Sequence, residues 1–157
     1  MRFLVQPALT ARTRPPVRIF LVFATLALVG FAAQRVLSGG LSPAGVEAYY
    51  LGAGGGEPLA AVALWEEVHA VAFVYGFVLF MLGSLAASSP LPPRLRTGLL
   101  WTAFGATLAD LFAPFALLAL GAGGALRVVT FAAAGLSLAA LMAAVVVSFG
   151  RAGDARG

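Results

Sequence analysis

Two titratable side chains, Glu66 and His69, lie three residues apart where a long apolar stretch begins. At this spacing a carboxylate and an imidazole share one face of a helix, where they could transfer a proton, form half of a metal site or ligate a haem. Ionisable groups are costly in hydrocarbon, so this pair is a functional-site hypothesis. The alternative is an interfacial hydrogen-bonded pair that ends the helix near water, and a position within a turn or two of the outer surface favours it.

A second candidate is Asp110, the only acid deep within an apolar stretch. Pro114 follows four residues later, and because proline has no N–H it leaves the carbonyl of Asp110 without its helical donor. We expect Asp110 to be uncharged, since Arg127 is predicted to lie beyond the outer end of its span. Its expected hydrogen-bond partners are Thr107 and Tyr75, the latter at a similar depth. Asp110 is then either a proton carrier or a structural link between helices.

Four long apolar stretches must position these groups. Apolar residues make up 61% of the chain and charged residues 10%, against roughly 25% charged residues in soluble domains. Each stretch has about 18–24 residues, enough for a helix to cross a hydrocarbon core of about 30 Å. Backbone polar groups in lipid must be paired within the segment, which favours helices. We therefore predict an all-α antiparallel bundle of four transmembrane helices, with spans at about 19–36, 62–87, 99–120 and 126–149.

The distribution of arginines predicts the orientation of this bundle. Most arginines precede the first span, join the second and third, or follow the fourth, and only Arg35 and Arg127 fall on the other side. The positive-inside rule then places both termini in the cytoplasm. We expect a cytoplasmic arm at 1–18, an external loop at 39–58, a cytoplasmic tail at 150–157 and a location in the bacterial inner membrane.

The external loop carries the signals of a short helix. Ser42 is typical of an N-cap and Pro43 of the first helical position. This helix would end at Tyr49 and Tyr50, which suit the membrane interface. A later glycine-rich connection, 121–125, predicts that the third and fourth spans are antiparallel neighbours.

The second span carries a stripe of residues at alternating spacings of three and four. Glycines on such a stripe allow close approach of another membrane helix. We therefore expect Gly76 and Gly83 to lie at helix–helix contacts, and Glu67, about 100° away, to reach the headgroup zone. The stripe consists of Glu66, His69, Phe73, Gly76, Phe80, Gly83 and Ala87.

Composition excludes several kinds of chemistry. The chain has no cysteine, which rules out thiolate catalysis and covalent c-type haem attachment. Its single histidine rules out a bis-histidine haem within the chain, and too few ligands are present for a zinc or di-iron site. The arginines are scattered without interleaved aromatics, so nucleic acid is not an expected partner. No nucleophile–base pair or phosphate loop is present, and we expect neither catalytic residues nor a resident cofactor.

The run 45–52, which contains Tyr49-Tyr50 and Gly52, precedes Glu66-x-x-His69 and then Phe73. This pattern resembles an uncharacterised family of small bacterial four-helix membrane proteins over residues 41 to about 114. In that family the second helix reads Glu-x-x-His-x-His and a further histidine follows a Leu-Gly pair. The corresponding residues here are Val71 and Ser84. The resemblance implies a respiratory membrane setting.

Three functions follow from these observations. The first is a non-catalytic membrane subunit or scaffold that packs against partner subunits, or against copies of itself, in a respiratory or electron-transfer complex. The second is a redox subunit that binds haem b or quinone through His69 and a ligand from another chain. The third is a small proton-coupled transporter that uses Asp110. The small-residue stripe and the scarcity of chemical groups favour the first.

Overall fold

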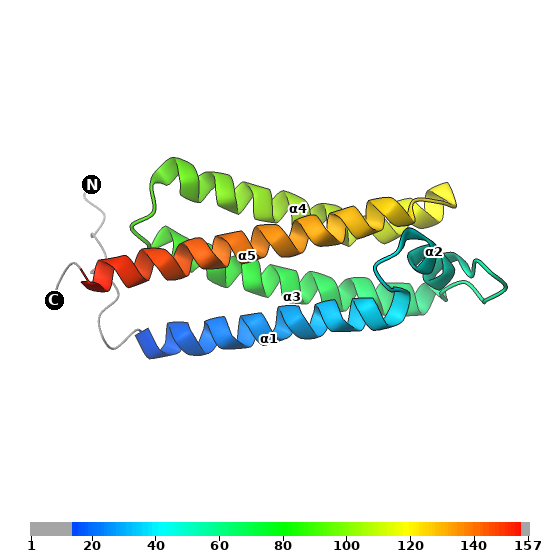
Figure 1. The fold of residues 1–157 in the computed structure, drawn as a ribbon, viewed down its shortest axis with the longest axis horizontal. Coiled ribbons are helices and arrows are strands. Elements are labelled where there is room, and N and C mark those ends of the chain that lie inside the picture. The colour runs from blue at the N-terminus through cyan, green and yellow to red at the C-terminus, as the bar shows by residue number, and fades with distance from the viewer. Residues whose placement is uncertain (1–13, 155–157) are drawn as a thin grey trace.

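The computed structural model describes residues 14–154, and within this range every regular element is a helix (Figure 1). Four of the five helices are long and apolar enough to cross a membrane, which confirms the predicted fold class. The helices are α1 (Arg14–Gly39), α2 (Pro43–Leu51), α3 (Ala61–Ala87), α4 (Pro93–Leu120) and α5 (Gly124–Asp154).

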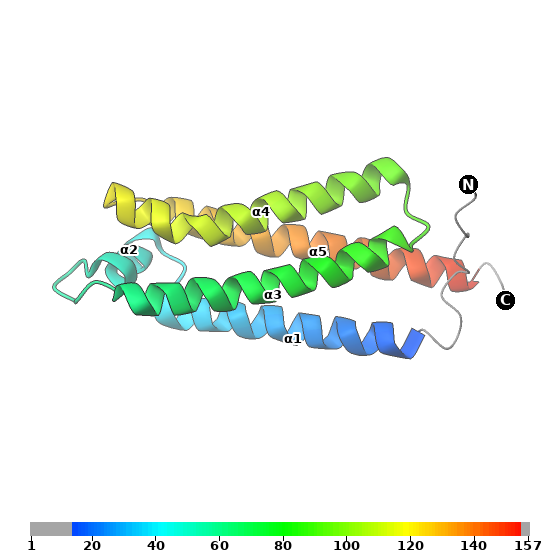
Figure 2. The ribbon, with the colours of Figure 1, turned by 180° about the vertical axis from the view of Figure 1, so that it is seen from behind.

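The four long helices run side by side with alternating direction (Figures 1 and 2). One end of the bundle carries α2, the connections around it and the α4–α5 turn, and we call this the outer end. The start of α1, the α3–α4 connection and the last turns of α5 lie together at the opposite, inner end. Gly121 ends α4 with φ 65° and Gly123 follows with φ 120°, values that glycine adopts readily. The predicted glycine-rich turn between antiparallel neighbours is therefore present.

The helices extend beyond the apolar stretches that predicted them. The arm was expected to reach residue 18, but α1 already begins at Arg14, and prolines 15 and 16 fit its first turn, where N–H groups have no helical acceptor. Likewise α4 begins at Pro93 and α5 continues to Asp154. Hydropathy marks only the part of a helix that contacts hydrocarbon. The rest of the predicted arm, residues 1–13, and the last three residues of the predicted tail lie outside the described range.

The short helix α2 forms for the predicted reasons and lies across the outer end. The Ser42 hydroxyl accepts a hydrogen bond from the Gly45 N–H at 3.1 Å, and Pro43 occupies the first turn. Gly52 ends the helix in the left-handed conformation with φ 67°. The helix packs against α1, α4 and α5.

A carboxylate fastens α2 to the start of α5. Glu47 accepts hydrogen bonds from the N–H groups of Gly123 and Gly124, at 3.1 and 2.9 Å. These N–H groups belong to a helix N-terminus, which favours a negative charge. The backbones also meet directly, because a Cβ added to Gly124 would collide with the carbonyl of Pro43.

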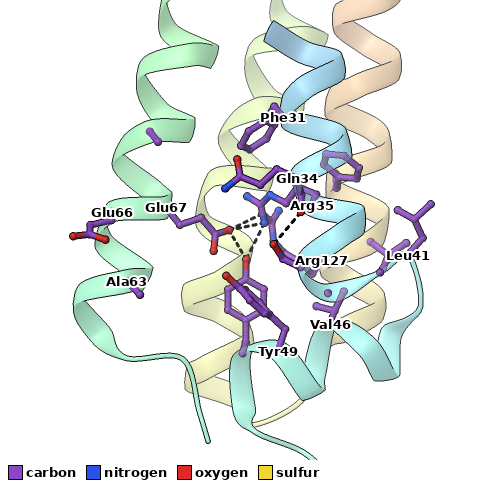
Figure 3. A pocket seen from close by; sticks show the side chains of 17 residues that line it. Phe31, Gln34, Arg35, Leu41, Val46, Tyr49, Ala63, Glu66, Glu67 and Arg127 are labelled. Carbon is purple, nitrogen blue, oxygen red and sulfur yellow. Dashed lines mark hydrogen bonds and ion pairs between the residues drawn. The ribbon is translucent and has the colours of Figure 1, made fainter. Parts of the chain in front are cut away.

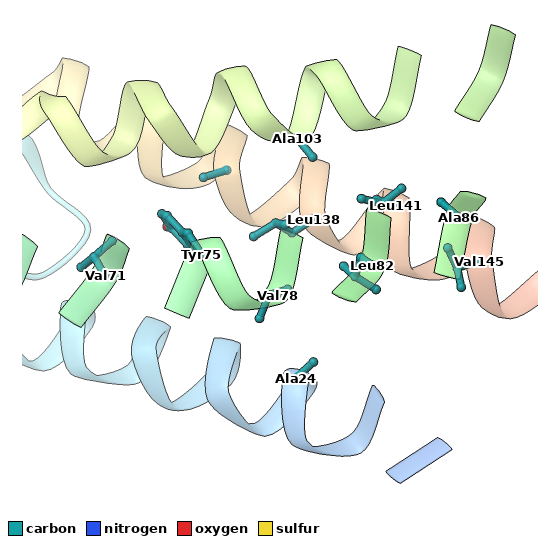
Figure 4. Close-up of a cluster of buried hydrophobic side chains, with 11 residues drawn as sticks. Ala24, Val71, Tyr75, Val78, Leu82, Ala86, Ala103, Leu138, Leu141 and Val145 are labelled. Atoms are coloured by element: carbon teal, nitrogen blue, oxygen red, sulfur yellow. The ribbon is translucent and has the colours of Figure 1, made fainter. Parts of the chain in front are cut away.

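The main core lies between α3 and α5, with α1 and α4 adding small residues (Figure 4). Leu82, Leu138 and Leu141 are fully buried, and Ala103 and Ala134 let the helices approach closely. The buried face of α3 comprises Leu64, Val71, Tyr75, Val78, Leu82 and Ala86.

The predicted packing of Gly76 against another helix is wrong, whereas Gly83 lies at a side-chain contact with α4. Gly76 has no neighbouring atom within 4 Å of the position where a Cβ would lie, and Gly83 meets only a methyl of Leu100 at 3.6 Å. Phe73 and Phe80, on the same stripe, are exposed. On both faces of this membrane helix, apolar residues recur every three or four positions. The small residues therefore did not show which face packs against the rest of the chain. Most of the stripe faces away from the other helices of the chain, although Phe80 and Gly83 lie beside Leu100 of α4.

Candidate functional site

Charged and phenolic side chains from several helices meet inside the outer end of the bundle. Arg35 from α1 forms an ion pair with Glu67 from α3, with 2.7 Å between Nη1 and Oε1. The Tyr50 hydroxyl from α2 accepts a hydrogen bond from Arg35 at 2.8 Å and donates one to Glu67 at 2.5 Å. Three helices are thus joined through one carboxylate oxygen, and the Arg35 and Glu67 side chains are only 14% and 15% exposed.

A second ion pair lies deeper, between α4 and α5. The Arg127 guanidinium pairs with the carboxylate of Asp110. The same nitrogen donates to the backbone carbonyl of Asp110 at 3.0 Å, which is the carbonyl that Pro114 leaves without a helical donor. Asp110 is completely buried and the Arg127 side chain is 2% exposed. The proline therefore creates the acceptor that helps to hold the arginine.

Two hydroxyls complete the surroundings of Asp110. The Tyr75 hydroxyl donates to Oδ2 at 2.9 Å, so the predicted contact between these residues is present. Thr130 lies 3.5 Å from Oδ1. The other predicted partner, Thr107, donates instead to the carbonyls of Ala103 and Phe104 in its own helix.

The expectation that no cation lies near Asp110 is wrong. Arg127 was predicted to lie beyond the outer end of the span, but it belongs to the first turn of α5, which begins at Gly124. Its guanidinium points into the bundle instead, and its Nη2 lies 3.9 Å from Glu67. The two ion pairs thereby form one network of two guanidinium groups and two carboxylates. We call Arg35, Glu67, Tyr50, Arg127 and Asp110 the outer network.

A cavity of about 290 Å³ adjoins the outer network (Figure 3). Its walls come from α1, α2, α3 and α5 and include Phe31, Tyr49 and Phe131 beside the charged groups. Figure 3 shows Glu67 directed toward Arg35 and Arg127, whereas Glu66 points away from them. Asp110 does not line the cavity, and Arg127 lies between the two.

Several polar atoms beside the cavity have no hydrogen-bond partner among the described residues. They are Nε of Arg35, Oε2 of Glu67, and Nε and Nη2 of Arg127. Donors and acceptors in a low-dielectric interior are usually paired. Because Arg35, Glu67 and Arg127 line the cavity, a small side-chain rotation would present these donors and the one carboxylate acceptor to a bound molecule.

The pKa values of Tyr50 and Glu47 are shifted in the directions that favour the hydrogen bonds of these side chains. Burial raises the pKa of Tyr50, in the loop helix α2, so the phenol keeps the proton that it donates to Glu67. The N–H groups of Gly124 and Gly123 lower the pKa of Glu47, because they stabilise its charged form.

The predicted pair of Glu66 and His69 does not join the outer network. Glu66 and His69 are both exposed on α3, and neither contributes to the ion pairs and hydrogen bonds of the outer network. Glu66 is one of the residues that line the cavity, although its side chain points away from the outer network (Figure 3), and His69 does not line it. Within the described range no group of three or more histidine or acidic side chains could hold a metal ion.

Sequence reasoning missed four members of the site: Arg35, Tyr50, Glu67 and Arg127. Glu67 was expected near the headgroups and Tyr50 at the interface, yet both point into the bundle. One signal was available, because Arg35 and Arg127 were the two exceptions to the arginine asymmetry. Arginines at the unfavoured end of membrane helices need a reason to be there, and here each has a carboxylate partner.

The fold and the site define a multi-pass integral membrane protein with buried charges at one end. Residues 40–155 match the model of a family described as a transmembrane helical domain, and the chain belongs to that family. The match covers α2 to α5 and most of the site, whereas Arg35 precedes it. No curated protein and no solved structure matches the chain.

Proposed function

We propose that this chain is a non-catalytic subunit of the bacterial inner membrane that packs against partner helices in a respiratory or electron-transfer assembly. The observation that carries the proposal is the exposure of Glu66 and His69 on α3. The respiratory setting comes from the resemblance in residues 41–114.

The depth of these side chains supports a protein neighbour. At 1.5 Å per residue α3 is about 40 Å long, and His69 lies about 12 Å from its first residue. With α3 centred in a hydrocarbon core of about 30 Å, the imidazole lies several ångströms inside the lipid boundary. Polar groups at such positions usually face protein. The exposed rings of Phe73 and Phe80 continue the same face.

The outer network supports a structural rather than a catalytic role for the buried charges. The Asp110 carboxylate is held by Arg127 and Tyr75, Arg127 also donates to the Asp110 carbonyl, and Asp110 does not line the cavity. A proton carrier needs a path to water, so this placement disfavours the transporter alternative. The haem alternative requires a ligand from another chain, which His69 is exposed enough to meet.

The test replaces both outward polar residues, as Glu66→Leu with His69→Leu, and measures assembly by native gel electrophoresis of gently solubilised membranes. We expect the high-mass species to be lost while the isolated chain stays folded, because leucine is compatible with lipid but removes polar contacts to a partner. Leu136→Ala, at an exposed site on α5, is the control and should assemble normally. Unchanged assembly in the double variant would show that this face contacts lipid. A visible absorption spectrum of the assembly distinguishes a complex that binds haem through His69 from one without haem.

A further inference from the structure

The cavity beside the outer network has the features of a binding site for a small molecule. It is lined by residues of four helices, and its volume of about 290 Å³ is close to the lower end of the range for ligand pockets. Apolar and aromatic side chains form much of its wall, and a few polar groups converge on one region. This combination matches the usual composition of ligand sites.

The unpartnered atoms define what the ligand must offer. Nη2 and Nε of Arg127 are donors on a side chain that is only 2% exposed, and Nε of Arg35 is a third donor. They require acceptors such as carbonyl oxygens. Oε2 of Glu67 is an acceptor that a hydroxyl could satisfy. A ligand with carbonyl oxygens, which become hydroxyls on reduction, can serve both kinds of atom.

The charges that line the cavity indicate which net charge the ligand should have. Arg35 and Arg127 are already neutralised by Glu67 and Asp110 in two ion pairs. An anion would therefore add an uncompensated charge inside the bundle, where charges are costly. Glu66, which also lines the cavity, adds a further negative charge against an anionic group. The balance favours a neutral molecule.

The shape of the site favours a ring that arrives from the bilayer. Phe31, Tyr49 and Phe131 offer aromatic surfaces to a planar headgroup. Helix α1 is the least buried of the four long helices, and its Phe20 packs against Phe77 of α3 with 6.1 Å between ring centroids. A lipid-soluble molecule could thus enter beside α1 and leave its tail among the lipids.

We propose that this cavity binds the headgroup of a neutral, lipid-soluble ring compound with carbonyl groups, of the quinone class, through Arg127, Arg35 and Glu67. The site differs from the sequence-based alternative, which assigned a quinone to His69. Binding does not depend on the partner subunit proposed above, because all of the walls belong to one chain.

The experiment measures quenching of tryptophan fluorescence by a benzoquinone with a decyl tail, using purified protein in phosphatidylcholine nanodiscs. Trp101 is exposed and outside the cavity, so Trp101→Phe leaves Trp65, next to Glu66, as the single reporter. We expect quenching that saturates at one quinone per chain. A rise in quenching that is only proportional to quinone concentration would indicate partition into lipid and would overturn the proposal.

Two pairs of variants test the location. Val128→Phe fills the cavity, whereas Val129→Phe places the same ring on the exposed side of α5. Ala63→Phe and its exposed neighbour Val62→Phe form an independent pair on α3, which covers the case in which Val128→Phe fails to fold. We expect affinity to fall at least tenfold in each cavity variant and to stay unchanged in each control. Equal affinity in all four folded variants would exclude the cavity.

Competition tests the chemistry of the ligand. Decylbenzene, which has the ring and tail without carbonyl oxygens, should not displace the quinone, since it leaves the arginine donors unpaired. Displacement at equal concentration would show an apolar cavity without polar recognition. Phosphatidylglycerol in the nanodiscs should also leave quinone affinity unchanged. Selective loss of quinone binding with this lipid would mark an anionic headgroup site and overturn the neutral-ligand assignment.

Discussion

The guanidinium of Arg127 contacts both the carboxylate of Asp110 and the backbone carbonyl of the same residue, the latter at 3.0 Å. Pro114 is the reason that this carbonyl is available, since it lacks the N–H that would occupy it in a regular helix. A helix irregularity and an ion pair therefore form one structural unit between α4 and α5. Arg127 and Asp110 are almost completely buried, so the charge of each side chain depends on the other for compensation.

The first prediction concerns this dependence. Arg127→Met should lower the free energy of unfolding in detergent by about 3–5 kcal/mol, because it leaves the Asp110 carboxylate buried without a cation. Adding Asp110→Asn should recover much of the loss, since the remaining amide carries no charge. Thermal or denaturant unfolding of the single and double variants measures both effects. Additive losses in the double variant would mean that the two side chains are not coupled.

The second prediction follows from the pKa of Glu47. Two N–H groups lower the pKa of this carboxyl below its ordinary value of about 4.5, so its ionised form stabilises the folded state. This contribution is present above about pH 4.5 and is lost as the pH falls through the lower pKa of the folded protein. Glu47→Ala should therefore unfold at a lower temperature than the parent at neutral pH. The difference should shrink on acidification; a difference independent of pH would contradict the assignment.

The third prediction uses two glycines of α5. A methyl group at Gly124 would collide with the backbone carbonyl of Pro43, whereas Gly135 has nothing within 4 Å. Gly124→Ala should cost about 1–3 kcal/mol of stability by separating α2 from the α4–α5 turn. Gly135→Ala is the matched control and should be neutral or stabilising, since alanine favours helices. Equal unfolding temperatures for both variants would show that α2 does not pack at this turn.

The fourth prediction concerns orientation, which the arginine asymmetry assigns and the bundle itself leaves open. The chain has no cysteine, so single cysteines can be introduced without background labelling. Ala53→Cys, in the exposed α2–α3 connection, should react with a membrane-impermeant maleimide in spheroplasts. Ser88→Cys, at the inner end, should react only after permeabilisation. Labelling of both from the same side would refute the antiparallel topology, and the reverse pattern would place the termini outside.

Features that depend on neighbours along the chain could be predicted from the sequence. The length of the apolar stretches determined four spans, because the thickness of a bilayer sets the length of a helix that crosses it. Ser42 and Pro43 determined the start of α2 through local hydrogen bonding and ring geometry. Residue counting placed Tyr75 near the depth of Asp110, and proline chemistry identified the free carbonyl.

The rotation of each helix about its axis was decided only by the tertiary structure. Position along a membrane helix follows from residue number, but both lipid and protein core are apolar, so hydropathy does not show which face is buried. For this reason Gly76 and Glu67 were each assigned to the wrong side of α3. The inward direction of Arg127 likewise depends on Asp110 and Glu67, which are distant in sequence and come together only when α3, α4 and α5 pack.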